Sequence, residues 1–179
     1  MRIVVITGSP RKKGTSAYLA EQFIKGAKEL GHSIVRYDAA ELNINGCKGC
    51  GYCRKNNGIC IQNDIMAEIN KDVSEADMVL FVTPLYFFGM SSQLKTVIDR
   101  FYAINWSIRE KGIKKAMIFM TCNDKTEETY NALLLHYKAI VKNFGWDNCG
   151  YLFAQGYNKR QEIMNTEFAK KAYDIGRNI

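Results

Sequence analysis

A loop near the N-terminus carries the residue types that bind a phosphate group. It runs from Gly8 to Ser16 and brings glycines, hydroxyls and cations to the start of an expected helix. Exposed backbone N–H groups and the positive end of the helix dipole would attract an anion there, and Arg11 can add a bidentate contact. The candidate contacts are Ser9, Arg11, Lys13, Gly14, Thr15 and Ser16.

Two better-known phosphate loops do not fit this segment. Five residues separate Gly8 from Gly14, one more than a Walker loop allows, and the dinucleotide fingerprint is absent as well. The alternative is a loop without a ligand, in which Thr15 or Ser16 caps the helix and the basic side chains are solvated.

A second loop is unusually apolar. It follows an expected strand at 78–83 and contains Pro84, Leu85, Tyr86, Phe87, Phe88 and Gly89. Loops lie at the surface and are normally polar, so a flat apolar partner is expected to cover this one. An isoalloxazine ring fits, with Tyr86 or Phe87 stacked on it and backbone N–H groups at its polar edge. A loop buried in the core or in a dimer interface is the alternative.

Four of the six cysteines are close together in the chain. Cys47, Cys50, Cys53 and Cys60 follow the spacing Cys-x2-Cys-x2-Cys-x6-Cys. Thiolates at this spacing can ligate a [4Fe-4S] cluster or close a tetrahedral zinc site, and they can also remain free thiols. The spacing leaves all three options open.

Strands and helices alternate along the chain and position these loops. Short apolar runs predict strands at 2–7, 33–38, 78–83, 116–121 and around 151–154, and helical periodicity predicts helices at 16–30, 92–101, 126–144 and from about 160 onward. This alternation indicates a doubly wound α/β fold in a single domain, 1–179, with a cysteine-rich insertion at 43–63. Ligands bind such sheets at the carboxyl ends of the strands, where these loops begin.

Composition excludes several classes of protein. The net charge is +7, but the basic runs at 11–13 and 111–115 fall at turns without a recognition helix, so we expect no nucleic-acid partner. No apolar run reaches membrane-spanning length, and no signal segment is evident, so we expect no membrane association. The six cysteines then favour the reducing cytoplasm.

Several motifs together resemble the NAD(P)H-dependent FMN reductase and iron–sulfur flavoprotein branch of the flavodoxin-like superfamily. They are Gly8-Ser9-Pro10-Arg11, Gly14-Thr15-Ser16, Thr83-Pro84-Leu85-Tyr86, Gly89-Met90-Ser91, Leu94-Lys95 and Asp99-Arg100. The resemblance implies a flavodoxin-like, five-stranded parallel sheet in the order 2-1-3-4-5. It also implies that Ser9, Arg11, Thr15 and Ser16 hold the FMN phosphate, residues 84–89 hold the ring, and Thr121 with Cys122 complete the pocket.

The same resemblance implies an oxidoreductase in which NAD(P)H reduces FMN and electrons pass to a small acceptor. Members are usually dimeric, so a homodimer or a dimer of dimers is expected. No side chain is expected to act as a catalytic acid or base, and His32 and His136 are expected to be structural or solvent-facing. Asp99 and Arg100 are expected to fix their helix, while Tyr102 and Trp106 are candidates for the mouth of the site, the core or an interface.

Three other functions stay open. An iron–sulfur flavoprotein would relay electrons from ferredoxin through the cluster and FMN. A flavodoxin-type electron carrier fits less well, because such carriers are acidic and have a different phosphate loop. A flavin-free binding module on the same scaffold is the third, since a fold does not determine a function.

Overall fold

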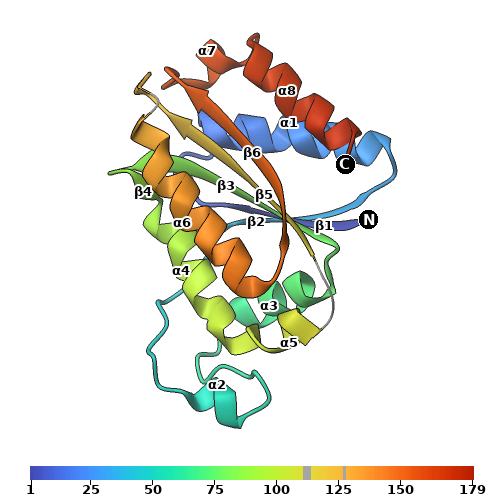
Figure 1. Ribbon diagram of the computed structural model, residues 1–179, viewed down its shortest axis with the longest axis vertical. Coiled ribbons are helices and arrows are strands. Elements are labelled where there is room, and N and C mark those ends of the chain that lie inside the picture. Colours follow the sequence, from blue (N-terminus) through green and yellow to red (C-terminus); the bar gives the residue numbers. More distant parts are fainter. Residues whose placement is uncertain (111–113, 127) are drawn as a thin grey trace.

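The computed structural model describes residues 1–110, 114–126 and 128–179 and contains a twisted sheet between two layers of helices (Figure 1). Residues 111–113 of the basic run and residue 127 of the expected third helix lie outside the described residues. Five parallel strands adjoin in the order β2-β1-β3-β5-β6, which confirms the predicted order 2-1-3-4-5. They are β1 (Arg2–Thr7), β2 (Ser33–Asp38), β3 (Met78–Tyr86), β5 (Lys115–Cys122) and β6 (Asp147–Gln155).

The central strands are buried on both faces, which explains why their sequences are continuously apolar. In β1, Val4 and Ile6 face one core while Ile3 and Val5 face the other. One core is covered by α1 (Thr15–Glu29) and α8 (Glu167–Arg177). The opposite core is covered by α3 (Met66–Glu75), α4 (Ser92–Arg100) and α6 (Glu128–Phe144).

The structure contains a ten-residue helix that no predicted range covers, α3, and differs from the sequence prediction at two further places. A two-residue strand, β4 (Gly89–Met90), pairs antiparallel with the end of β3 and turns the expected apolar loop into a hairpin. The expected last helix is divided into α7 (Arg160–Ile163) and α8, because the backbone at Thr166 is extended and its hydroxyl donates to the carbonyl of Ile163. The remaining short elements are η1 (Ala39–Glu41), α2 (Tyr52–Lys55), η2 (Phe101–Ile104) and α5 (Ser107–Glu110).

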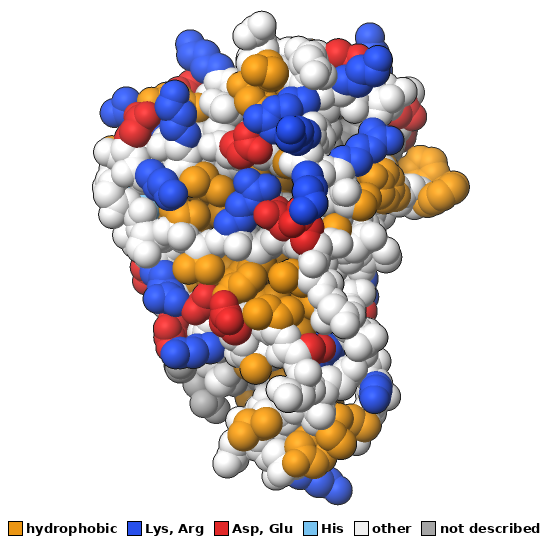
Figure 2. All heavy atoms as spheres, turned by 180° about the vertical axis from the view of Figure 1, so that it is seen from behind, with side chains coloured by type: hydrophobic (Ala, Val, Ile, Leu, Met, Phe, Trp, Pro, Cys, Tyr) orange, Lys and Arg blue, Asp and Glu red, His pale blue; other side chains and the backbone are white. Residues whose placement is uncertain are grey.

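The cysteine-rich segment leaves the body of the fold. It extends from η1 to α3, and Figure 1 shows it around α2 at the lower end of the molecule, beyond the end of α4. Figure 2 shows lysines and arginines interspersed with acidic side chains on one face, and they do not gather into a single basic patch there. No helix in the described part of the chain is both long and apolar enough to span a membrane.

Candidate functional site

A cavity of about 240 Å³ opens where β1, β3, β5 and β6 end. It brings together ten of the fourteen residues expected at an FMN site: Ser9, Arg11, Gly14, Thr15, Ser16, Pro84, Leu85, Tyr86, Thr121 and Cys122. The other four, Lys13, Phe87, Phe88 and Gly89, do not line it. Asn123, Tyr157 and Asn158 complete the lining and were not expected.

The N-terminus of α1 faces this cavity with its first N–H groups uncapped. Gly14 is the N-cap residue, and no described side chain makes a capping hydrogen bond there. The hydroxyls of Thr15 and Ser16 instead lie 3.3 Å and 2.7 Å from the hydroxyl of Thr121, on β5. Because the N-cap residue is a glycine and neither hydroxyl caps the helix, the first N–H groups of α1 are available to an anion at the positive end of the helix.

Arg11 reaches the same cavity from the β1 loop. Its Nη1 donates to Oδ1 of Asn158 at 2.9 Å, across the cavity on the loop after β6. The backbone N–H groups of Asn158 and Lys159 in turn donate to the carboxylate of Glu162, at 2.9 Å and 3.1 Å. Asn158 could have been found from the sequence, because the loop after the last parallel strand opens at the same edge of the sheet.

The hairpin of β3 and β4 carries its aromatic tip away from the cavity. Leu85 and Tyr86 pair with Met90 and Gly89, and Phe87 and Phe88 occupy the turn with φ values of +45° and +63°. Phe87 is 100% exposed and Phe88 60%, and neither is part of the cavity lining. Tyr86 is therefore the aromatic residue of this loop that lines the cavity.

Gly8 lets the loop between β1 and α1 approach α4 closely. Its carbonyl accepts a hydrogen bond from Oγ of Ser91 at 2.7 Å, and Ser91 caps α4. A Cβ atom at position 8 would lie 2.3 Å from Oγ of Ser91 and 2.6 Å from Cβ of Leu94. No side chain fits there without moving α4.

We expect Gly8→Ala to lower the free energy of unfolding by about 1–3 kcal/mol, the usual range for overpacking. Urea denaturation without added ligand measures this. Gly46→Ala is the matched control, because a Cβ there would meet nothing within 4 Å. Equal unfolding free energies for the two variants would contradict the close approach.

The four clustered cysteines are free thiols at the other end of α4. Cys47 and Cys50 are exposed, and Cys53 and Cys60 are half-buried. Burial, and then the neighbouring Cys60 and Cys47, raise the pKa of the Cys53 thiol, so both of these cysteines lie within electrostatic reach of Cys53. In the described ranges, no three His, Cys, Asp or Glu side chains are arranged so that they could hold a metal ion.

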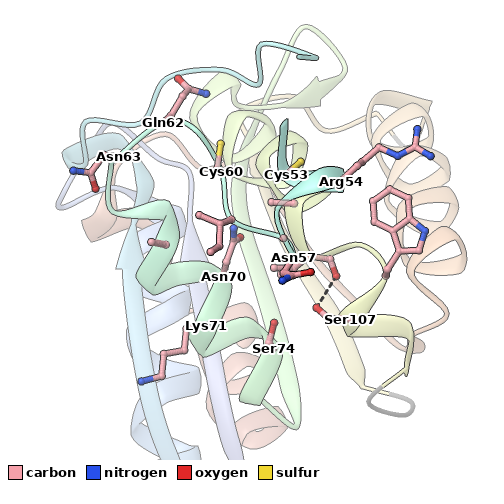
Figure 3. Close-up of a pocket in the computed structure, with 16 residues that line it drawn as sticks. Cys53, Arg54, Asn57, Cys60, Gln62, Asn63, Asn70, Lys71, Ser74 and Ser107 are labelled. Carbon is pink, nitrogen blue, oxygen red and sulfur yellow. Dashed lines mark hydrogen bonds between the residues drawn. The ribbon is translucent and has the colours of Figure 1, made fainter. Parts of the chain in front are cut away.

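A larger cavity, of about 640 Å³, lies beside the cysteine loop (Figure 3). Cys53 and Cys60 form part of its wall, together with residues of α3, η2 and α5. Trp106 belongs to this wall and carries the guanidinium of Arg54 over its ring at 5.4 Å. Trp106 and Tyr102 therefore lie away from the cavity at the strand ends.

Neither histidine lies at the cavities of the strand ends or the cysteine loop. His32 contacts the N-terminal amine through Nδ1 at 3.1 Å, and His136 is exposed on α6. Asp99 pairs with Lys95 on the same helix at 2.6 Å. Arg100 is buried and pairs with Asp64 at 2.7 Å, so both residues stabilise the surroundings of α4.

The fold agrees with the comparisons to known proteins. A family model of NADPH-dependent FMN reductases matches residues 1–141, and the chain belongs to this family of oxidoreductases. Within it, the chain groups with the iron–sulfur flavoproteins. One from Archaeoglobus fulgidus is 30% identical over 180 aligned residues, which cover 100% of this chain and 79% of the relative. Another, from Methanocaldococcus jannaschii, is 31% identical over 147 residues, covering 79% of this chain and 76% of the relative.

Solved structures share the fold at lower identity. An NAD(P)H:quinone oxidoreductase from Methanothermobacter marburgensis superposes with a TM-score of 0.75 at 20% identity, covering 99% of this chain and 95% of the other. An azoreductase from Bacillus anthracis gives a TM-score of 0.76 at 17% identity, with 100% of both chains covered. These likenesses show the flavodoxin-like fold.

Proposed function

We propose that this oxidoreductase binds FMN in the cavity at the strand ends and passes electrons from NAD(P)H to an acceptor through FMN and an iron–sulfur cluster. The observation that carries the proposal is the uncapped N-terminus of α1, which faces the same cavity as Arg11 and the apolar residues 84–86. The wall formed by Arg11 and the N-terminus of α1 suits a phosphate, and the wall formed by residues 84–86 suits a flat ring. The cavity is smaller than most cofactor pockets, so part of the ring would stay open to a substrate.

The bound FMN would supply the redox chemistry by accepting a hydride and releasing electrons singly or in pairs. The protein's part is then to bind and orient it. None of the residues that line this cavity is Asp, Glu or His. Burial raises the pKa of the Cys122 thiol, which lies 3.1 Å from the carbonyl of Asp124, so this side chain remains protonated at neutral pH. These features support a site without a dedicated acid or base.

The cysteine loop supplies suitable ligands for a [4Fe-4S] cluster. Four thiols are available and unpaired, and Cys47 and Cys60 are close enough to Cys53 to raise the pKa of its thiol. Zinc needs all four sulfurs around one ion, whereas a cluster binds each thiolate through a different iron, so its ligands can be further apart. The names of the relatives from Archaeoglobus and Methanocaldococcus support the same choice.

Anaerobic reduction tests the proposed electron path. We expect NADH or NADPH to bleach the flavin absorbance of the FMN-loaded protein, and an added quinone to restore it over repeated cycles. Free FMN without protein is the control. If neither nicotinamide reduces the bound flavin while reduced ferredoxin does, the protein is an electron-transfer flavoprotein and NAD(P)H is not its donor.

We also propose a homodimer or a dimer of dimers. Phe87 and Phe88 are exposed, and both have left-handed backbone conformations, which cost about 1–3 kcal/mol each. Burial of their rings in an interface between two chains would offset this cost. Light scattering is expected to show Phe87→Ser shifting the protein toward single chains. Leu135→Ser is the matched control, because Leu135 is exposed on α6. A wild-type protein that is monomeric at all concentrations would contradict the assembly.

The cytoplasm is the compartment that best suits this protein. All six cysteines are unpaired in the structure, and the cytosol keeps thiols reduced. A ferredoxin or a small molecule is the proposed acceptor class.

A further inference from the structure

A buried arginine contacts the last of the clustered cysteines. Arg100 ends α4 and is 2% exposed. Its Nη2 donates to Sγ of Cys60 at 3.6 Å, within the range for a sulfur acceptor. The same nitrogen donates to Oδ1 of Asp64 at 2.8 Å, and Nη1 donates to Oδ2 of Asp64 at 2.7 Å. The carboxylate thus fixes the plane of the guanidinium and aims one N–H group at the sulfur.

The same guanidinium ties both ends of the cysteine loop to α4. Nη1 also donates to the backbone carbonyl of Asn45 at 2.8 Å. Asn45 precedes Cys47 by two residues, and Asp64 follows Cys60 by four. One side chain therefore joins the start and the end of the loop, and Cys60 is the one clustered cysteine whose sulfur accepts a hydrogen bond from a side chain in the described part of the chain.

We propose that Arg100 is a positioning residue for the iron–sulfur centre: it fixes the sulfur of Cys60 and raises the reduction potential of the cluster through its N–H···S hydrogen bond. This inference rests on the cluster of the proposed function. Hydrogen bonds to ligand sulfurs are among the features that set cluster potentials, because a donor stabilises the additional negative charge of the reduced form. Arg100 is placed to stabilise that charge when the cluster accepts one electron.

The geometry also predicts that lysine cannot replace Arg100. A lysine keeps the positive charge, but its single nitrogen cannot hold Asp64 by two parallel bonds and also donate to the sulfur in a fixed direction. Arg100→Lys therefore separates the directed hydrogen bond from the charge. Asp64→Asn is the complementary change: it removes the negative charge of the ion pair, while the amide oxygen at position 64 can still accept from Arg100, whose charge and N–H groups remain.

The test compares wild type, Arg100→Lys, Arg100→Gln and Asp64→Asn, each prepared anaerobically with iron and sulfide. Redox titration with dithionite, followed by electron paramagnetic resonance, gives the midpoint potential of the one-electron cluster couple. Iron content, FMN content and the thermal unfolding midpoint are measured on the same samples. The FMN potential is the internal control, because the FMN cavity lies at the opposite end of α4.

We expect the cluster to become about tenfold harder to reduce in Arg100→Lys and Arg100→Gln, a decrease of about 59 mV for one electron. Asp64→Asn removes a negative charge, so its cluster potential should stay the same or rise. If Arg100→Gln also loses its iron while Asp64→Asn, with the same thermal unfolding midpoint, keeps it, that result supports the positioning of Cys60 by Arg100.

Three results would overturn the inference. An unchanged cluster potential in both Arg100 variants would show that the hydrogen bond from Arg100 to Cys60 does not raise this potential. If the Asp64 and Arg100 variants all lose iron, or if their cluster potentials all shift in the same direction, the substitutions act through the general stability of the loop. Iron-free wild-type protein would overturn the cluster itself and this inference together, while FMN binding by that protein would leave the flavin site standing.

Discussion

Arg11→Ala is expected to weaken FMN binding ten- to a hundredfold. The guanidinium is held at the cavity by Asn158, and a charge-assisted hydrogen bond to a phosphate contributes about 1.5–3 kcal/mol. Titration of the FMN-free protein with FMN, followed by quenching of flavin fluorescence, measures the change. Thr15→Ala should weaken binding as well, since its hydroxyl lies in the same cavity.

Lys12→Ala is the matched control for this experiment. Lys12 neighbours Arg11 in the sequence, but its side chain is exposed and pairs with Glu41 at 2.8 Å, and it does not line the cavity. A general effect of basic charge would therefore weaken binding in Lys12→Ala as much as in Arg11→Ala. Unchanged FMN affinity in both Arg11→Ala and Thr15→Ala would place the phosphate elsewhere.

Cys50→Ser is expected to remove the iron from the protein. A cluster of the proposed kind contains about four iron and four sulfide per chain, and the loss of one thiolate ligand leaves one iron without its protein contact. Iron and sulfide analysis of anaerobically purified protein, with its visible spectrum, measures the loss. FMN content should stay unchanged, because Cys50 lies outside the cavity at the strand ends.

Cys149→Ser provides the control. Cys149 is also a half-buried free thiol, but it lies on β6, with its sulfur 3.8 Å from the carbonyl of Asp147. We expect this variant to keep its iron. A yellow, iron-free wild-type protein from an anaerobic, iron-supplied preparation would exclude the cluster and leave the FMN assignment in place.

The sequence predicted the sheet because its central strands are buried on both faces. Residues 3–6 of β1 and residues 78–82 of β3 are all buried and apolar, which gives a short continuous run that differs clearly from the helical periodicity of α1. The carboxyl-edge rule then predicted which loops would meet. Ten of the fourteen expected residues do line one cavity for this reason.

Other features of the structure depend on turns and long-range contacts that no local sequence pattern indicates. The hairpin that turns Phe87 and Phe88 outward needs two left-handed residues, and such turns normally show Asn-Gly. The pairing of Arg11 with Asn158 joins positions 147 residues apart. The contact between Arg100 and Cys60 likewise arises because the cysteine loop meets the C-terminal end of α4. The sequence predicted the helix or strand to which each of these residues is attached, but not the residue that each one contacts.

The most direct test of the flavin site compares the binding of FMN with that of riboflavin, which lacks the phosphate. The account predicts that the protein binds FMN at least a hundredfold more tightly than riboflavin, because Arg11 and the N-terminus of α1 contact the phosphate. It also predicts that Arg11→Ala reduces this preference. Equal affinities for FMN and riboflavin in the wild-type protein would contradict a phosphate site at α1.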